Sequence, residues 1–335
     1  MGSFSNFDWI KKITQPNGQF MPIKSVIQFM RTFNDDEKCL HYLGHLKWGQ
    51  EGWRCLKCGN GEYSFVSTRN LIKCKRCHYQ ESFIVNTIME KSKRPLSEWF
   101  WTIYTIATQK TGLSAKELYR QMDFGSYQTA WTWLQKIRMS MAEIDRTSLK
   151  DDVEVDETYV FTGKAGRGRI IQGKKALIVG AVEVLHGKKR QIVSGRIKLR
   201  TIPSANSANL HSFIKDHVER NSIVKTDNWK GYNNISRYGY KHVPFAIDKP
   251  EDASRKLPRI HWVFSNLKSW LIGTHRFVSR KHLQNYLNEF SFRYNARYDP
   301  IGAFNHVLKN AIFTESRTYD GFTKPIQPIY VNPGE

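Results

Sequence analysis

The sequence is poor in acidic residues and has no long apolar run. It contains 30 Asp and Glu residues against 52 Lys and Arg, which gives a formal net charge of +22 at pH 7. No stretch of about 18 apolar residues occurs, which argues against a membrane-spanning helix. The first residues also lack the basic and apolar regions of a signal peptide. We therefore expect a cytoplasmic protein with no membrane partner.

The excess of positive charge favours a polyanionic partner. A strongly basic surface raises both the affinity for nucleic acid and the rate of encounter with it. A ribosomal protein or a protein bound to an anionic membrane surface would carry a similar imbalance, and these are the alternatives on composition alone. With 335 residues the chain is long enough for two or three domains with real cores.

Cysteine is also scarce, but its spacing is informative. Four of the five cysteines form two pairs, Cys55-x2-Cys58 and Cys74-x2-Cys77, and Cys39 stands apart. In a chain without an export signal this spacing favours zinc over disulfides. Four thiolates close a tetrahedral site, so we predict one structural Zn2+ whose binding drives folding of its small domain. Cys39 is expected to be a small buried apolar residue on a helix.

Changes in pattern along the chain predict five segments. These are a helical lead-in (1–50), a four-cysteine zinc ribbon (51–85), a helical segment (90–145), an α/β domain (150–310) and a C-terminal tail (311–335). In the helical segment, Ser114 and Glu117 form a capping-box signature, and Gly125-Ser126 is a turn that begins another helix. Two short helices joined by such a turn are typical of a helix-turn-helix unit.

The last helix of this segment carries polar residues that could face a DNA major groove. The positions expected to be exposed are Gln128, Thr129, Thr132, Gln135 and Lys136. The alternative is a three-helix bundle that only bridges two domains.

The pattern after residue 150 predicts an α/β core. Strands are indicated at 153–156, 176–185, 191–199 and in the run that ends at Asp227; helices are indicated at 206–218, 261–272 and 279–295, with a loop at 248–258. Three strands able to pair antiparallel, a helix, a buried strand and closing helices describe the RNase H-like fold.

Two isolated carboxylates, Asp156 and Asp227, stand in or just after short β-branched runs of this basic chain. Hard divalent cations prefer oxygen ligands, and two Mg2+ ions would catalyse reactions of phosphodiesters there. Glu157 should point to the opposite face of the sheet from Asp156. Glu154 shares the Asp156 face one pleat away. We interpret both glutamates as solvated or packing-edge charges.

No carboxylate is available as a third ligand in the helix expected to supply one. Between Asp252 and Glu289 the sequence has neither Asp nor Glu. Asn266 is predicted to lie on the inward face of that helix, where its side-chain carbonyl could bind a cation; a hydrogen bond to the backbone is the equal alternative. His261 lies some 140° round the helix from Asn266, so both are not expected to reach one metal. Which of the two completes the site stays open.

Other side chains are candidates for contacts with DNA. A glycine-rich basic loop carries Lys164, Arg167 and Arg169, which could clamp phosphates, although a mobile surface hairpin would look the same. Lys268 lies on a basic face of the closing helices. Trp229 and Tyr232 could stack on a splayed base, but core packing is the more common role.

Several motifs together resemble a known family. They are the four-cysteine ribbon and the segments 93–100 (KRPLSEWF), 113–118 (LSAKEL), 155–159 (VDETY), 226–232 (TDNWKGY) and 261–268 (HWVFSNLK). Over about 33–308 the chain resembles bacterial insertion-sequence transposases of the ISXO type, relatives of the Merlin elements. These combine a zinc ribbon, a helical segment and a DDE-type core.

The resemblance implies a catalytic triad of Asp156, Asp227 and Asn266, with Asn266 where most DDE enzymes carry Glu. It implies binding of double-stranded DNA at terminal inverted repeats, cleavage dependent on two Mg2+ ions (Mn2+ substituting), and transfer of the freed 3′-OH to target DNA. A homodimer or larger assembly at the bacterial nucleoid is expected. The alternatives are a catalytically inactive DNA-binding regulator and a nuclease that cuts without joining.

Overall fold

The computed structural model describes residues 23, 25–49, 52–66, 69, 71–142, 147–162, 175–187, 192–246 and 250–323. The chain forms two compact units. The first takes the residues up to Ile144 together with Asp299–Lys324, and the second takes Asp145–Tyr298. None of the helices in the described ranges is long and apolar enough to cross a membrane.

The first unit consists of helices around an aromatic core. In chain order the helices are α2 (Val26–Thr32), α3 (Asp36–Trp48), α4 (Leu96–Thr108), α5 (Ala115–Gln121), α6 (Tyr127–Ser140), α11 (Pro300–Ala311) and α12 (Tyr319–Thr323). The caps predicted from the sequence are present, because Ser114 accepts from the backbone N–H of Glu117 and Ser126 from that of Thr129. Phe29 packs on Tyr104 and Phe304 in the centre.

A small antiparallel sheet belongs to the same unit. Its strands β1 (Tyr63–Val66), β2 (Leu71–Cys74) and β3 (Gln80–Ser82) pair in the order β1-β2-β3. Cys74 is the last residue of the central strand, so the sheet positions one of the two cysteine pairs. This is the predicted zinc ribbon.

The second unit is built on a five-stranded sheet in the order β6-β5-β4-β7-β8. Strands β4 (Asp152–Phe161), β5 (Lys175–His186) and β6 (Ile192–Ile202) are antiparallel, whereas β7 (Ile223–Asp227) and β8 (Lys241–Phe245) run parallel to β4. The helices are α7 (Ser207–His217), α8 (Pro250–Lys256), α9 (Pro258–Trp270) and α10 (Leu283–Asn295). This is the predicted RNase H-like architecture.

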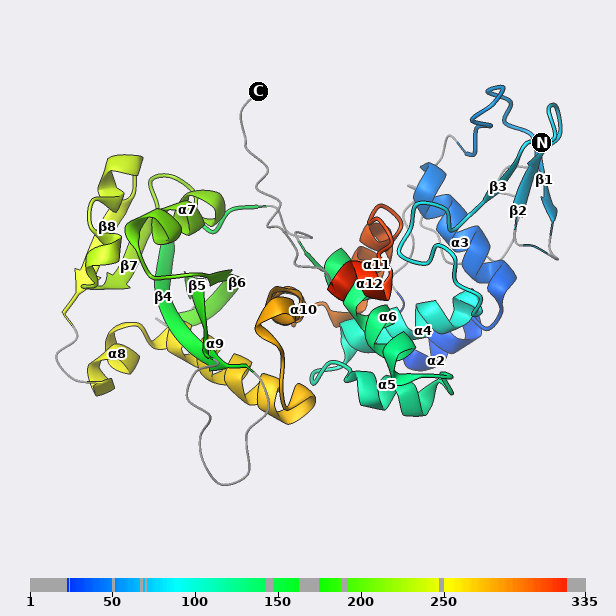
Figure 1. Ribbon diagram of the computed structural model, residues 1–335. Helices are drawn as coiled ribbons and strands as arrows, with labels where there is room; N and C mark the ends of the chain where they lie inside the picture. The colour runs from blue at the N-terminus through cyan, green and yellow to red at the C-terminus, as the bar shows by residue number, and fades with distance from the viewer. Residues whose placement is uncertain are drawn as a thin grey trace. The chain divides into compact units, whose positions relative to one another are not determined.

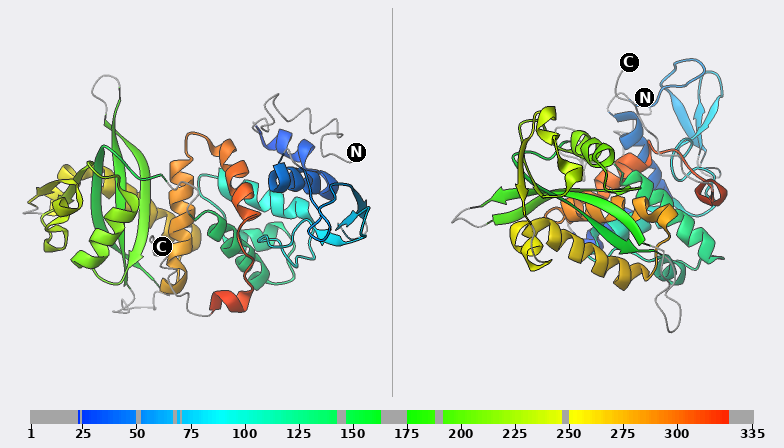
Figure 2. Two further views of the ribbon diagram at one scale, coloured as in Figure 1. Left: turned by 90° about the horizontal axis from the view of Figure 1, so that it is seen from above. Right: turned by 60° about the vertical axis from the view of Figure 1, so that its left-hand side comes forward.

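Helices cover both faces of this sheet. Residues of α7 pack on one face, and residues of α9 and α10 pack on the other, as Figures 1 and 2 show. Strand β5 is therefore an almost continuous apolar run. Gly180 of β5 lies opposite Asp156, and a Cβ there would stand 2.8 Å from Phe264 of α9. The missing side chain lets α9 approach the centre of the sheet.

The structure differs from the sequence-based expectations in three places. The stretch 248–258, predicted as a loop, contains α8, because Pro250 is the first residue of the helix and a proline is tolerated there. Strand β8 was not predicted. Residues 299–310, assigned by pattern to the α/β domain, group with the first unit, where Tyr42 donates to Asn305 at 2.7 Å.

Candidate active site and metal centre

The two candidate aspartates lie side by side on neighbouring parallel strands. Glu154 of β4 pairs with Lys225 of β7, so two residues further along both strands bring Asp156 level with Asp227. Burial raises the pKa of Asp156 to about 7, and repulsion from the carboxylates of Glu157 and Asp227 adds to the shift. Burial also raises the pKa of Asp227. A cation between the two groups would relieve this cost.

Helix α9 is fixed on the sheet by Glu154. Its Oε2 accepts the backbone N–H groups of Arg259 and Ile260 at 2.8 and 2.9 Å. Only 4% of Glu154 is exposed, and burial raises its pKa despite these bonds. The interpretation of Glu154 as a solvated or packing-edge charge was therefore wrong: the carboxylate satisfies free N–H groups at the start of a helix.

This helix directs His261 at Asp156. The Nε2 atom of His261 lies 3.3 Å from Oδ2 of Asp156. That nitrogen is buried and has no hydrogen-bond partner among the described residues. Burial lowers the pKa of His261, and the nearby ammonium of Lys268 lowers it further. The ring is thus neutral at pH 7, which is the form that ligates metals.

Asn266 lies elsewhere on the same helix. The buried stripe of α9 consists of Ile260, Val263, Phe264, Leu267 and Trp270. The prediction that Asn266 faces inward was wrong, because the residue is exposed. At 100° per residue Asn266 lies at one edge of the stripe, whereas His261 and Lys268, two turns apart, share the other edge. That second edge faces β4.

Lys268 adds a positive charge beside Asp156. Its Nζ donates to Oγ1 of Thr158, two residues after Asp156 on the same face of β4, at 2.7 Å. The ammonium acts on Asp156 to lower the carboxyl pKa, and burial lowers the pKa of Lys268 itself. Contact between Lys268 and DNA stays a prediction, and the structure puts this cation at the edge of the carboxylate site.

Glu157 lies on the opposite face, as strand alternation predicts. Its Oε2 accepts a hydrogen bond from the hydroxyl of Tyr232 at 2.5 Å, and Tyr232 is buried in the core under α7. Trp229 is 49% exposed, and its ring nitrogen donates to the carbonyl of Ala205 at 2.7 Å. Its backbone N–H donates to Asp227 at 3.1 Å, which orients that carboxylate.

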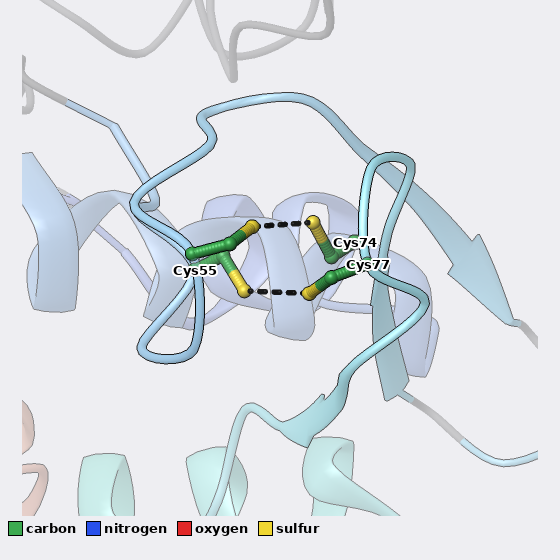
Figure 3. A group of neighbouring side chains, drawn as sticks. Cys55, Cys74 and Cys77 are labelled. Atoms are coloured by element: carbon green, nitrogen blue, oxygen red, sulfur yellow. Dashed lines mark hydrogen bonds between the residues drawn. The ribbon is translucent and has the colours of Figure 1, made fainter.

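The four paired cysteines converge in the first unit. Their sulfur atoms all lie within 4.8 Å of one another, with Cys55 and Cys77 3.5 Å apart and Cys58 and Cys74 3.7 Å apart (Figure 3). Tetrahedral coordination with Zn–S bonds of about 2.3 Å requires sulfurs about 3.8 Å apart. The spacing and the all-thiolate donor set fit one structural zinc ion.

Backbone geometry prepares these thiols for a metal. The N–H of Gly59 donates to the carbonyl of Cys55, and the N–H of His78 donates to that of Cys74, so each pair closes the same kind of knuckle. Gly59 and His78 both adopt positive φ. Although burial opposes it, hydrogen bonds from the backbone of Cys77 and Arg76 lower the pKa of Cys74 to about 6. Cys39, outside the site, is buried on α3 as predicted.

Two protein-family models match the segments that contain the two candidate sites. Residues 148–295 match the ISXO2-like transposase domain, and residues 34–80 match the transposase zinc-ribbon domain. The first match contains both candidate aspartates and the second contains all four paired cysteines. The chain therefore combines a transposase zinc ribbon with an ISXO2-like transposase domain. The DDE-type core predicted from the resemblance is thus confirmed at the level of the family.

Individual relatives are more distant. The transposase is 23% identical over 286 residues to an uncharacterized protein in transposable element ISH50 of Halobacterium salinarum, covering 82% of this chain and 93% of the relative. Among solved structures it matches a pre-cleavage Mos1 transpososome (14% identity, TM-score 0.27, 62% of this chain and 78% of the other). It also matches a Mos1 paired-end complex with the left transposon end (14%, TM-score 0.28, 64% and 80%).

The helix-turn-helix residues of the transposase divide into exposed and packed positions. Gln128 and Thr129 are exposed at the start of α6, and Thr132 is half-buried. Gln135, expected on the surface, is fully buried. Lys136 is half-buried, and its ammonium donates to Ser316 at 2.8 Å, so it packs within the unit. Contacts of these side chains with DNA remain predictions.

Three predicted DNA contacts, Lys164, Arg167 and Arg169, lie outside the described residues. The residue that sequence reasoning undervalued is His261. It was kept only as the alternative to Asn266, because the two side chains were not expected to reach one metal. Its heptad spacing to Lys268 was the signal that could have placed it, because residues seven apart on a helix lie on one edge.

Proposed function

We propose that the transposase cleaves DNA at the ends of its element and joins the freed 3′-OH to target DNA, with divalent cations held by Asp156, Asp227 and His261. The observation that carries the proposal is the convergence of two half-buried aspartates and His261, whose Nε2 atom lies 3.3 Å from Oδ2 of Asp156. No cation already present in the described residues neutralises both carboxylates, although Lys268 lies beside one of them.

The donor set fits a hard or borderline divalent ion. Carboxylate oxygens bind both Mg2+ and Mn2+, and a neutral imidazole binds Mn2+ more readily than Mg2+. When bound, a pair of such ions activates the attacking oxygen and stabilises the leaving one. We propose two Mg2+ ions as the physiological metals, with Mn2+ able to substitute.

The residues around the metals would position the reacting groups. Asp156 and Asp227 provide oxygens from two strands whose register is fixed by backbone pairing. Glu154 holds α9 so that His261 stays in reach. Lys268 places an ammonium beside the site, where it would offset negative charge that develops on the phosphate in the transition state.

Asn266, the third member implied by the family resemblance, has less support from the geometry. It is exposed and lies at the edge of α9 away from His261 and Lys268. We therefore prefer a site made of Asp156, Asp227 and His261. Mutation of His261 and of Asn266 compares the two candidates for the third position directly. Intact aspartates in the converged site also count against the catalytically inactive regulator.

The first unit is proposed to bind the inverted repeats. A groove of about 340 Å3 is lined by Gln128, Thr129 and Thr132 of α6 and by the cations Lys91 and Lys93. Polar side chains beside cations suit reading of bases next to phosphates. Two element ends must be brought together for joining, so a homodimer or larger assembly at the nucleoid is proposed for the active state.

A strand-transfer assay tests the proposal. Purified transposase is incubated with labelled end DNA, a target plasmid and Mg2+ or Mn2+. Asp156→Asn and Asp227→Asn should each abolish nicking and joining while end binding persists. Asp151→Asn is the matched control, because Asp151 is exposed near the start of β4 and its φ of 62° suits asparagine.

The same assay separates the alternatives. His261→Ala should weaken metal binding and should reduce the rates of cleavage and of joining by at least the same factor. Asn266→Ala should cleave and join DNA as the wild type does. The reverse result would return Asn266 to the site. Binding without any cleavage would favour the regulator, and cleavage without joined product would favour the nuclease.

A further inference from the structure

The connection between α9 and α10 contains a strained turn. A single π-helical turn, Leu271–His275, extends α9. Arg276 then has φ 57° and ψ −56°, and the backbone N–H of Phe277 donates to the carbonyl of His275 at 2.6 Å. This is a γ-turn with positive φ, a rare and costly conformation for a residue other than glycine.

The turn is held firmly by the core beneath it. Leu271 and Val278, on either side, are buried among the side chains of α9 and α10. The ring of His275 packs edge-on against Trp270 at 4.7 Å and Tyr286 at 4.8 Å between centroids. These contacts hold the backbone of the turn in its strained conformation.

The turn exposes apolar side chains at its tip and basic side chains around them. Ile272 is 65% exposed and Phe277 is 49% exposed. Arg276 and Arg280 are exposed and make no side-chain hydrogen bond or ion pair within the described ranges of the chain. Two large apolar side chains beside two cations suit neither solvent nor an ordinary protein core.

We infer that the turn Leu271–Arg280 is a wedge that enters double-stranded DNA and unstacks a base step about five base pairs from the cleaved end. Apolar side chains that insert between base pairs, with cations on the flanking phosphates, are a recognised means of kinking a duplex. The inference rests on the proposed function for the identity of the DNA. The excess of 22 positive charges on the chain favours a polyanion over a second copy of the protein.

The geometry of α9 gives the distance at which the wedge acts. Ile272 follows His261 by eleven residues, which corresponds to about 16 Å along a helix. For a duplex that runs along α9, with base pairs that rise about 3.4 Å each, the distortion should lie about five base pairs from the phosphate held at the proposed metal site. A steric role of the turn in protein packing would predict no distortion at any position.

The test uses full-length protein and end DNA with 2-aminopurine at successive positions. The cleavage-deficient Asp156→Asn protein should raise 2-aminopurine fluorescence about five base pairs from the cleavage site, and adding Phe277→Ala should remove this signal. Phe313→Ala in the same background is the matched control, because Phe313 is also exposed, at 65%, and lies in the other unit.

Binding to altered DNA gives a second readout. Phe277→Ala should weaken binding to matched end DNA by about tenfold, within the range for loss of one stacked base. A mismatch at the distorted step should restore the affinity, because the cost of unstacking no longer falls on the protein. No fluorescence change at any position, or equal loss on matched and mismatched DNA, would overturn the wedge.

These outcomes are separate from those of the strand-transfer assay. The fluorescence measurement requires no cleavage, so it can succeed when the proposed reaction fails. Arg276→Gly adds a further check, since glycine accepts positive φ without strain. This variant should melt at a higher temperature than wild type yet bind end DNA less tightly; higher stability with unchanged binding would count against the inference.

Discussion

At the scale of single residues, the candidate site depends on which edge of α9 faces β4. Asn266 was predicted inward because it stands three residues after Val263 and four before Trp270, both of which are buried. On the helix circumference, Val263 and Trp270 lie on one side of the centre of the buried stripe and Phe264 lies on the other. Asn266 lies beyond Val263 and Trp270, at the edge of the stripe away from β4. The faces of the two aspartates were easier to predict, because side chains of a strand point to only two faces of the sheet.

Metal preference should depend on His261. Replacing the imidazole by a carboxylate, His261→Glu, gives an all-oxygen donor set, which Mg2+ prefers. We expect the ratio of Mg2+-supported to Mn2+-supported cleavage to rise by about tenfold or more, whereas Asn266→Glu should leave the ratio unchanged. Initial nicking rates at matched metal concentrations measure both. An equal response of the two variants would contradict a role for His261 as ligand.

Acidification should weaken metal binding through Asp156. Its pKa of about 7 lies above the ordinary value, so the carboxyl is protonated below that pH and must lose its proton to bind a cation. Affinity should fall about tenfold per pH unit below 7 and level off above it. Burial lowers the pKa of His261, so its protonation should contribute less to this dependence than that of Asp156. Mn2+ titration by electron paramagnetic resonance between pH 5.5 and 8.5 provides the measurement.

The same shift sets a stability difference in metal-free protein. A folded-state pKa above the unfolded value means that stability is present below the unfolded pKa and is lost as the pH rises through 7. Asp156→Asn should therefore raise the melting temperature at pH 8 more than at pH 5. Similar effects at both pH values would show that the carboxylate is not destabilised by its surroundings.

At the scale of elements, Glu154 links the sheet to α9. Replacing it with Ala leaves two N–H groups of a buried helix start without an acceptor, at a cost of about 1–3 kcal/mol. Glu154→Gln keeps one acceptor oxygen and should lose less. Urea denaturation measures the stability, and metal titration should show weaker binding in the Ala variant, since His261 is positioned by the same helix. Unchanged metal affinity in the Ala variant would show that the Glu154 cap does not position the metal site.

Elements with a clear period or cap were predictable from the sequence, and those set by long-range contacts were not. The alternation in β4 and the serine caps of α5 and α6 act locally, so they could be read directly. Helix α8 was missed because Pro250 was taken to mark a loop. Strand β8 is short and contains Pro244, which an edge strand tolerates.

At the scale of the whole molecule, the first unit is completed by a segment distant in sequence. Helix α11 packs on α4 and α6, and the backbone N–H of Ile88 donates to the carbonyl of Ala311 at 3.1 Å. Phe304 of this helix is fully buried among the aromatic side chains of α2 and α4. No local pattern in residues 299–323 could reveal that their partners precede residue 145.

Truncation after Tyr298 should therefore damage the first unit and spare the second. The deletion exposes the aromatic core around Phe29 and Phe100, so end binding should be lost and limited proteolysis should degrade the N-terminal part. The fragment 145–298 should stay protected. Phe304→Ala, which leaves a cavity costing about 3–5 kcal/mol, should have a milder effect in the same direction. Equal protection of both parts would contradict this division.

The position of α11 also orders events during synthesis. A ribosome releases residues 145–298 before it releases α11, so the first unit is completed only after the whole of the second unit has been made. If the first unit binds the inverted repeats as proposed, products that stop before α11 would not occupy element ends or block the full-length enzyme. Recognition of the element, as proposed, would thus begin only after α11 has been made, close to the gene that encoded the chain.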